Sequence, residues 1–327
     1  MTIASALTAL NTDIQNARTA ITNKGGTVTS GGGSSQLATD IATIPSGSGY
    51  SEFPSYQVTS GVASRRSGAL TGNEFSDITS VGNWSLWYAF YSHSELIGNL
   101  SFPSLTTVGV RGLEYAFYEC TGLTSINLSK LTTVGAYGLS QTLRGCSELI
   151  GNLNLSKLTT VEEYGLQYAF YNCQKLTTVE LSALTTVGNH GLYYAFSYCG
   201  FTSVSFTALT TVGSYGLSSV FYTGVYNPAL TNVSFPTLTA IDSYGLQSAF
   251  YGNKNLTDVY FNALTTSSFG SKTNQFVQMM NSTYGTKTHT LHFPSNLQST
   301  ISGLSGYPNF GGASGYVVLA FDLPATS

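Results

Sequence analysis

The sequence predicts a repeat solenoid, in which short units stack on one another along one axis. One phrase recurs seven times between residues 81 and 253, at intervals of 25 to 29 residues. A fixed period of this length is typical of units that cannot bury an apolar side alone and therefore stack on their neighbours. Each copy has an anchor residue at the same place, namely Val81, Val108, Val134, Val161, Val187, Val212 and Ile241.

Apolar residues at fixed distances from the anchor predict the core. Leucine stands five positions after the anchor in all copies, from Leu86 to Leu246. Phenylalanine stands nine positions after it in six copies, and Leu143 takes its place in the third. A buried side chain of this size contributes about 1.5–3 kcal/mol, so stacked copies of both columns are expected to hold the array together.

Three local patterns predict how one repeat, or rung, is built. The segment 123–128 ends in apolar and polar alternation with β-branched residues, which indicates a short half-buried strand. The Leu-Thr-Thr-Val stretch that follows indicates a second short strand or an extended turn. The Gly-Leu-x-x-Ala-Phe part has helical spacing, with a glycine such as Gly112 turning the chain into it. Each rung is therefore predicted to contain a strand, a turn and a short helix.

Together these motifs resemble the BspA-like class of leucine-rich repeats. The resemblance rests on Leu-Thr-x-Val-x-Leu, then Leu-Thr-x-Val-Gly, then Ala-Phe-x-x-Cys, and it covers roughly residues 70 to 276. It implies a solenoid of about eight rungs over residues 81–276, preceded by a cap and partial repeat at 50–80. Members of this class are mostly surface proteins or adhesins, so the resemblance also implies a binding role.

The amino-terminal 24 residues predict an amphipathic helix with a heptad seam. Apolar residues there follow spacings of 4, 3, 4, 3 and 4. Two interpretations remain open: self-association, with a trimer preferred by analogy with phage fibres, or a single helix that caps the first rung. Residues 25–49 read as a Gly/Ser-rich tether with a short apolar segment. The seam consists of Ile3, Leu7, Leu10, Ile14, Ala17 and Ile21.

Both ends resemble segments of phage or prophage tail-associated proteins. The stretch Ala20-Ile-Thr-Asn-Lys-Gly-Gly-Thr-Val, continued by residues 37–44, is similar to their N-terminal attachment segments. Residues 292–301 and 317–326 are similar to the C-terminal caps of repeat proteins from such phages, and 277–327 is predicted to be a cap. The resemblance implies that the N-terminal helix docks on other virion proteins.

Composition narrows the partners and the location. Charged residues make up 8% of the chain and the formal net charge is -3, which gives no basis for nucleic-acid binding. No window reaches the roughly 18 apolar residues of a membrane span, so no membrane insertion is expected. Residues 1–24 lack the pattern of a secretory signal peptide. Together with the resemblances to surface proteins and to phage tail proteins, these features lead us to expect the protein in a virion or outside the cell.

The polar and reactive residues do not predict an active site. Four cysteines share the column twelve after the anchor, which predicts a ladder of buried free thiols in preference to disulfides or zinc. His289 and His292 are separated by an odd spacing that sends their rings to opposite faces of a strand. No catalytic residues, cofactor or metal are therefore expected. The cysteines are Cys120, Cys146, Cys173 and Cys199.

One column is a candidate binding site. It lies three positions after the anchor and carries mostly aromatic and cationic residues, which suit stacking on sugar rings or a protein hot-spot strip. Alternatively, these side chains only cover the turn before the predicted helix. If they face solvent, their replacement should cost little stability. The column is Trp84, Arg111, Tyr137, Tyr164, His190, Tyr215 and Tyr244.

These observations favour a non-enzymatic protein of a phage or prophage tail that binds a host cell-surface glycan or protein. Two other functions remain open: a structural fibre or decoration subunit whose repeats contact copies of itself, and a bacterial surface adhesin. An enzyme is the weakest of the possibilities, because no set of base, nucleophile and electrophile is visible.

Overall fold

The computed structural model consists of two compact units, Met1–Arg66 and Ser67–Ser327. In the first unit, strands β1 (Tyr56–Thr59) and β2 (Val62–Arg65) form an antiparallel pair. The predicted heptad helix and tether lie outside the described residues and stay predictions. The structure describes residues 56–59, 62–65, 75–76, 78–223, 230–269, 274–280, 288–305, 307–308, 310 and 317–326.

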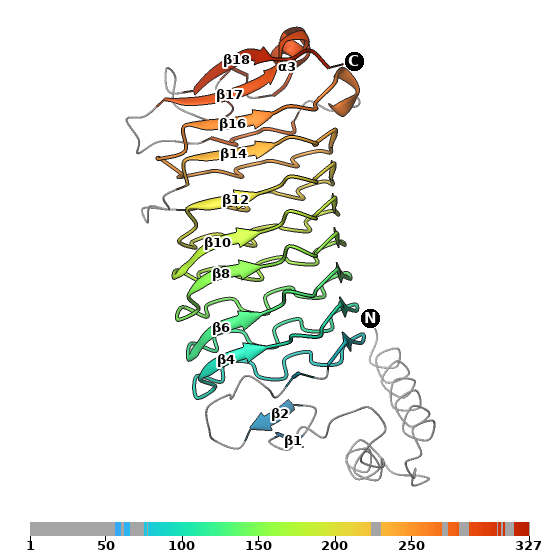
Figure 1. The fold of residues 1–327 in the computed structure, drawn as a ribbon, viewed down its shortest axis with the longest axis vertical. Coiled ribbons are helices and arrows are strands. Elements are labelled where there is room, and N and C mark those ends of the chain that lie inside the picture. Colours follow the sequence, from blue (N-terminus) through green and yellow to red (C-terminus); the bar gives the residue numbers. More distant parts are fainter. Residues whose placement is uncertain are drawn as a thin grey trace, which may run out of the picture. The chain divides into compact units, whose positions relative to one another are not determined.

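The second unit is a stack of rungs (Figure 1), and its first side is a seven-stranded parallel sheet. Each strand has two residues and ends on the anchor, whose side chain points into the core. Anchors of neighbouring rungs pair in register, which confirms the repeat alignment. The strands are β3 (Ser80–Val81), β5 (Thr107–Val108), β7 (Thr133–Val134), β9 (Thr160–Val161), β11 (Thr186–Val187), β13 (Thr211–Val212) and β15 (Ala240–Ile241).

Longer parallel strands form the second side, in the sheet orders β4-β6, β12-β10-β8 and β14-β16-β17-β18. Side chains alternate between core and surface along them, as β14 and β16 show. The strands are β4 (Gly98–Ser101), β6 (Leu123–Asn127), β8 (Gly151–Asn154), β10 (Leu176–Glu180), β12 (Ser203–Ser205), β14 (Asn232–Phe235), β16 (Asp258–Phe261), β17 (His289–Pro294) and β18 (Val317–Leu323).

The carboxyl-terminal segment continues this second side beyond the predicted solenoid boundary at residue 276. Strands β17 and β18 add to the edge of β16 in parallel register. The helical elements of the described chain also lie here: η1 (Thr266–Phe269), η2 (Ser295–Leu297) and α3 (Gln298–Ser302). An eighth rung is present too, because the N–H of Leu246 donates to the carbonyl of Gln275 at 3.0 Å.

The third side of each rung was predicted to be a short helix, and this prediction is wrong. Backbone N–H groups there alternate between two acceptors. The N–H of Leu113 donates to the carbonyl of Gly138 in the next rung, whereas that of Ala116 donates to the carbonyl of Leu113, three residues back, both at 2.9 Å. An α-helix requires acceptors four residues back. This side, called the turn side below, is therefore a ribbon of consecutive β-turns that also bonds to its neighbours.

The backbone angles explain why sequence periodicity misled the helix prediction. Every fourth residue on the turn side has a positive φ, as at Arg111 (53°), Tyr115 (55°) and Glu119 (52°). The third residue of a type II turn has this property, so the ribbon repeats every four residues. Over one short segment, the spacing of Leu113 and Phe117 fits this period as well as the 3.6-residue period of a helix.

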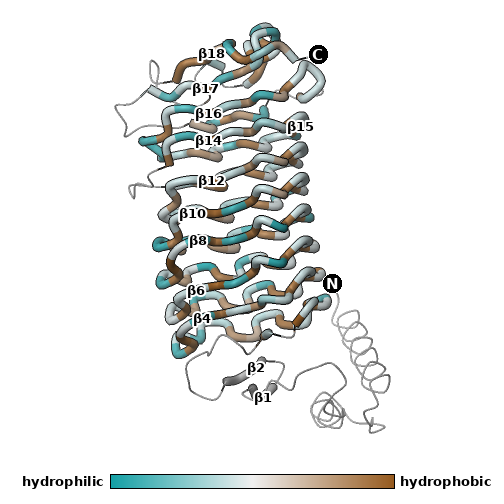
Figure 2. Tube along the Cα trace, in the orientation of Figure 1, coloured by the Kyte–Doolittle hydropathy of each residue, from teal (hydrophilic) through white to brown (hydrophobic). Residues whose placement is uncertain are grey.

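The predicted core columns are confirmed. Hydrophobic positions recur at corresponding places from rung to rung (Figure 2), and the phenylalanine column is buried from Phe90 to Phe250. The leucine column is buried from Leu113 onward, while Leu86 is half-buried in the first rung. Rings of the phenylalanine column stack on each other, with 5.0 Å between the centroids of Phe90 and Phe117.

A glycine exchange on the turn side distinguishes turns from a helix by the sign of its effect. Ser248 has a φ of 51°, a conformation that costs an L-residue roughly 1–2 kcal/mol and glycine almost nothing. We expect Ser248→Gly to raise the free energy of unfolding by about 1 kcal/mol, measured by urea denaturation. In a helix the same exchange would lower it by about 0.5–1 kcal/mol. Ser214→Gly, at a turn position without positive φ, is the control and should be mildly destabilising.

Candidate functional site: a tyrosine surface on the turn side

The predicted site column forms one continuous stack on the turn side. Its rings from Tyr137 to Tyr244 follow one another at centroid distances of 4.6 to 4.8 Å with interplanar angles of 11 to 18°. At the other end, the Arg111 guanidinium lies 5.0 Å from the ring centroid of Trp84 and 4.1 Å from that of Tyr137. The spacing is that of parallel strands. The column is a half-buried ladder, and Trp84 at its end is exposed.

Because the rings stack on one another, only part of each ring in the ladder is accessible to a ligand. A ring such as Tyr164 has Tyr137 on one face and His190 on the other, both within 4.7 Å. Recognition of a sugar by stacking needs an open ring face, which the interior of the ladder does not provide. The accessible groups are ring edges and hydroxyls, which combine apolar contact area with a polar end.

Two further aromatic columns on the same side were not singled out from the sequence. They lie seven and ten positions after the anchor, and examples are the stacked pairs Tyr88–Tyr115 at 4.5 Å and Tyr91–Tyr118 at 4.7 Å. With the ladder, and with Tyr193 and Tyr198 at six and eleven positions after the anchor, they form the tyrosine surface, which contains most of the 22 tyrosines of the chain. Its tyrosines are Tyr88, Tyr91, Tyr115, Tyr118, Tyr137, Tyr164, Tyr168, Tyr171, Tyr193, Tyr194, Tyr198, Tyr215, Tyr222, Tyr244 and Tyr251.

Ring contacts connect the three columns into one network. Tyr168 touches Tyr171, Tyr193 and Tyr194 at centroid distances of 5.0 to 5.6 Å. Tyr193 also touches His190 of the ladder at 5.6 Å. Because each ring is held by several others, the surface is ordered before any partner arrives, which reduces the entropic cost of binding.

The first rung carries both tryptophans of the chain at one end of this surface. Trp84 and Trp87 are in edge contact at 5.4 Å and are 52% and 45% exposed. Behind them the carboxylate of Glu114 is buried and accepts a 2.6 Å bond from Arg111. Burial raises the pKa of Glu114, and its bonds to Arg111 and to Trp87 oppose this shift. The charges of Arg111 and Glu114 therefore neutralise each other.

The tyrosine surface is close to uncharged at neutral pH. Burial raises the pKa of Tyr198 to about 12, and neighbouring tyrosines add to the shift. Burial also lowers the pKa of His190, partly opposed by Glu163, and the Nδ1 atom of His190 has no hydrogen-bond partner among the described residues. The imidazole therefore lies neutral between Tyr164 and Tyr215. The phenol groups stay protonated and are able both to donate and to accept hydrogen bonds.

The four cysteines form the predicted ladder of buried free thiols. The Sγ of each donates to a carbonyl of the preceding rung, for example from Cys146 to Phe117 at 3.2 Å. Burial raises the pKa of Cys120 to about 12 and also raises that of Cys173 well above its usual value. These thiols are therefore protonated and unreactive.

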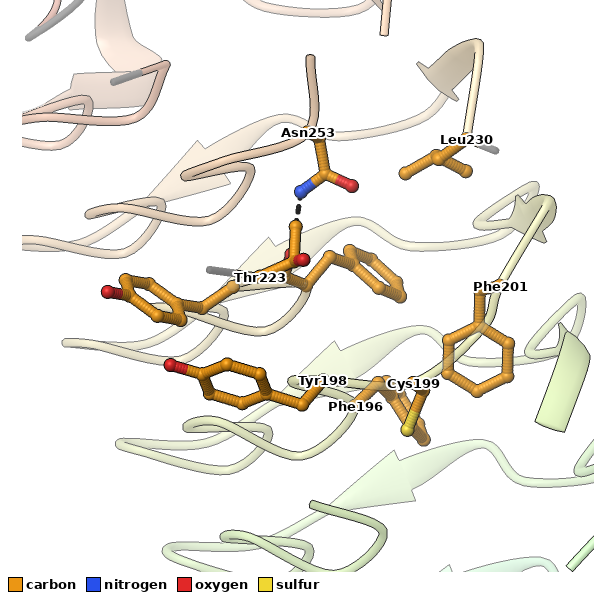
Figure 3. Close-up of a pocket in the computed structure, with 9 residues that line it drawn as sticks. Phe196, Tyr198, Cys199, Phe201, Thr223, Leu230 and Asn253 are labelled. Carbon is orange, nitrogen blue, oxygen red and sulfur yellow. Dashed lines mark hydrogen bonds between the residues drawn. The ribbon is translucent and has the colours of Figure 1, made fainter. Parts of the chain in front are cut away.

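A small space, partly open to solvent and with a cavity volume of about 10 Å³, lies where the cysteine column ends (Figure 3). Asn253 takes over the role of the thiols, because its Nδ2 donates to the carbonyl of Phe221 at 2.6 Å. The lining is mostly aromatic and offers few polar groups, so we assign no ligand to this space. It is lined by Phe196, Tyr198, Cys199, Phe201, Phe221, Tyr222, Thr223, Leu230 and Asn253.

The two histidines of β17 point to opposite faces. His289 is buried and its Nδ1 contacts the carbonyl of Leu256, whereas His292 lies between the carboxylates of Asp258 (3.0 Å) and Asp322 (2.9 Å). A hydrogen bond from Thr257, and after it the bond from His292, lower the pKa of Asp258. No cluster of three or more metal-binding side chains occurs in the part of the chain that the structure describes. No helix of that part is long and apolar enough to cross a bilayer.

Stacked parallel rungs, a repeat of 25 to 29 residues and buried leucine columns define a solenoid of the leucine-rich-repeat class. The model of the BspA type leucine rich repeat region matches residues 87–220 and 167–298, in six copies. The chain belongs to this family.

Two solved structures of leucine-rich repeat proteins are similar to this chain at low identity. One comes from Bacteroides ovatus, with 15% identity over 82% of this chain and 81% of that one, and a TM-score of 0.25. The other is a leucine rich cell surface protein from Faecalibacterium prausnitzii, with 13% identity over 75% and 88%, and a TM-score of 0.22. No curated protein matches the chain.

Proposed function

We propose that this protein is a non-enzymatic adhesin that binds a protein partner through the tyrosine surface. The observation that carries the proposal is a network of ring contacts that Arg111 and Arg144 make continuous from Trp84 in the first rung to Tyr251 in the seventh. Tyrosine, tryptophan and arginine dominate the energetics of protein interfaces, and lysine and acidic residues are depleted there. Tyrosine also supplies a large, adaptable contact area at a low entropic cost. Membership of the BspA type family supports a surface-exposed role.

The geometry favours a protein partner over a sugar. Both faces of the interior ladder rings are covered, which removes the platform on which sugar rings stack. Edges and phenol groups suit a polypeptide, which supplies apolar side chains together with backbone donors and acceptors. Our proposal therefore narrows the host ligand to a protein.

The second part of the proposal concerns where the protein is located, on a phage tail or on a bacterial surface. The resemblance of both termini to phage and prophage tail proteins supports a tail position, with residues 1–24 docking on other virion proteins or on copies of the same chain. Family membership alone supports the bacterial surface equally well. In both places the tyrosine surface would act in the same way.

Adhesion to host cells treated with protease or with periodate tests whether the partner is a protein or a glycan. The intact, labelled protein is added to untreated cells, to protease-treated cells and to cells whose glycans have been oxidised with periodate. We expect protease to abolish binding and periodate to leave it within twofold. Binding that survives protease but not periodate would contradict the proposal.

A double variant tests the surface itself. Ser219 and Ser248 already occupy the column of Tyr168 and Tyr194 in later rungs, so Tyr168→Ser with Tyr194→Ser introduces a residue that the fold accepts there. We expect at least tenfold weaker adhesion, measured where circular dichroism shows the variant folded. The two tyrosines take part in six ring pairs, so at about 0.5–1.5 kcal/mol for each pair the free energy of unfolding also falls by about 3–9 kcal/mol. The control is Thr178→Ala with Ser203→Ala on the strand side, which should bind normally. Equal adhesion of both variants would place the site elsewhere.

A further inference from the structure

One guanidinium within the tyrosine surface has no acidic partner in the part of the chain that the structure describes. Arg111 is neutralised by Glu114, but Arg144 has no carboxylate oxygen within 4.0 Å among the described residues. The neighbouring carboxylate of Glu119 is bonded to the hydroxyl of Tyr118 instead. This guanidinium therefore makes no ion pair within the described part of the tyrosine surface, although the Glu119 carboxylate lies beside Tyr118.

Its surroundings hold this guanidinium in place. The carbon Cζ of Arg144 lies 4.9 Å from the ring centroid of Tyr171, 5.2 Å from that of Tyr168 and 5.7 Å from that of Tyr118. Its Nη1 donates to the Oε1 of Gln141 at 2.9 Å. Gln141 is itself oriented, because its Nε2 donates to the hydroxyl of Tyr115. The group is half-buried, so its position is set before binding.

Most donors of this guanidinium remain unused. Arginine has five N–H donors in a planar fork, and the bond to Gln141 is the one hydrogen bond that its side chain makes to the described residues. Such a fork matches a carboxylate in bidentate geometry. In the same column other rungs carry tyrosine, as at Tyr118 and Tyr171, so stacking alone does not require an arginine here.

We propose that Arg144 binds the carboxylate of an aspartate or glutamate in an acidic segment of the protein partner. This inference rests on the proposed function and identifies the chemistry of the partner. A nucleic acid does not fit, because its phosphates need a row of cations and the surface offers one. An acidic sugar fits less well, since the rings around Arg144 contact one another, as Tyr168 and Tyr171 do at 5.5 Å.

Binding of short charged probes tests the proposal. Fluorescein-labelled oligoglutamate, oligoglutamine and oligogalacturonate are titrated with the intact protein at low salt, and fluorescence anisotropy gives the Kd. We expect saturable binding of oligoglutamate that weakens with salt, and none of oligoglutamine. Absence of oligoglutamate binding would overturn the proposal. Equal or tighter binding of oligogalacturonate would also overturn it, because the carboxylate would then come from a sugar.

Three variants separate recognition from stacking. Arg144→Tyr restores the tyrosine that neighbouring rungs use, so it keeps the stack and removes the charge, and we expect about tenfold or more weaker oligoglutamate binding. Arg144→Lys keeps the positive charge but lacks the planar fork of donors. Its affinity for oligoglutamate should lie between those of the wild type and Arg144→Tyr. Lys175→Gln removes a cation that is paired with Glu148 outside the surface, and should bind like the wild type. Unchanged binding by Arg144→Tyr would refute the assignment.

The cell assay distinguishes failure of this inference from failure of the proposed function. Protease-sensitive adhesion that depends on Tyr168 and Tyr194 but not on Arg144 would leave the adhesin role intact and remove the acidic segment. Adhesion that is insensitive to protease would contradict the adhesin role as proposed, whatever the oligoglutamate titration shows.

Discussion

Phe117→Ala is expected to lower the free energy of unfolding by about 3–5 kcal/mol. Phe117 is fully buried, and its ring stacks on Phe90 at 5.0 Å and meets Phe75 and Phe102 edge-on, each at 6.2 Å. Removing it leaves Phe90 without its stacking partner in the column and opens a cavity next to Leu143. Urea denaturation followed by circular dichroism measures the loss.

The effect of Phe117→Ala should also be local. In a solenoid each rung contacts only its neighbours, so hydrogen exchange should accelerate most in the adjoining rungs. The control is Phe170→Leu, because Leu143 fills this column naturally in one rung, and it should cost less than about 1.5 kcal/mol. Both variants remove a stacked ring, so equal losses would trace the effect to the missing ring and contradict the role of the cavity.

The architecture was predictable because it depends on residues that recur. The anchors and the leucine and phenylalanine columns each fill one place in every rung from the first to the seventh, and stacking requires that place to be apolar, while the buried cysteines fill one place in four consecutive rungs. Alignment of the copies therefore finds the core without knowledge of the backbone. The predicted second strand at Leu-Thr-Thr-Val is confirmed for the same reason, since Val187 pairs with Val212 in register.

The backbone of the turn side was not predictable from the same pattern. A four-residue turn repeat and a helix place Leu113 and Phe117 on one face almost equally well, and no glycine marks the positive φ of Tyr115. Tyrosine at such a position is unusual, so sequence rules argue against the turn that forms there. Neighbouring rungs offset the energetic cost of this positive φ, because they supply hydrogen bonds and ring contacts to the turn. A single rung does not reveal them.

The candidate site was predicted in part. The spacing of one rung correctly predicted that the ladder residues lie next to one another. The sequence alone does not show that stacking covers the faces of their rings. The other two columns were available as a signal, since Tyr88, Tyr115, Tyr168 and Tyr194 recur at one place. The arginines stand where other rungs carry tyrosine, and the lack of a carboxylate beside Arg144 needs three-dimensional contacts. The heptad seam, the tether and the oligomeric state stay predictions.

Triple replacement of Tyr137, Tyr164 and Tyr215 by Ala is expected to lower stability substantially. Solvent-facing rings would be replaceable at little cost, but these three take part in four stacked pairs with centroid distances of 4.6 to 4.8 Å. At about 0.5–1.5 kcal/mol for each pair, the loss is about 2–6 kcal/mol. It should appear as a lower urea midpoint with an unchanged slope.

The matched control replaces the same three tyrosines by Phe. This triple variant keeps every stacked pair and removes only the hydroxyls, so its stability should stay within about 1 kcal/mol of the wild type. Alanine is preferred to glycine in the test, because Tyr137 and Tyr215 have φ values of 56° and 55° and glycine would relieve that strain and mask the loss. If the Ala variant melted like the wild type, the rings would not be stacked in solution. Their faces would then be open to a sugar, and the choice of a protein partner would lose its structural basis.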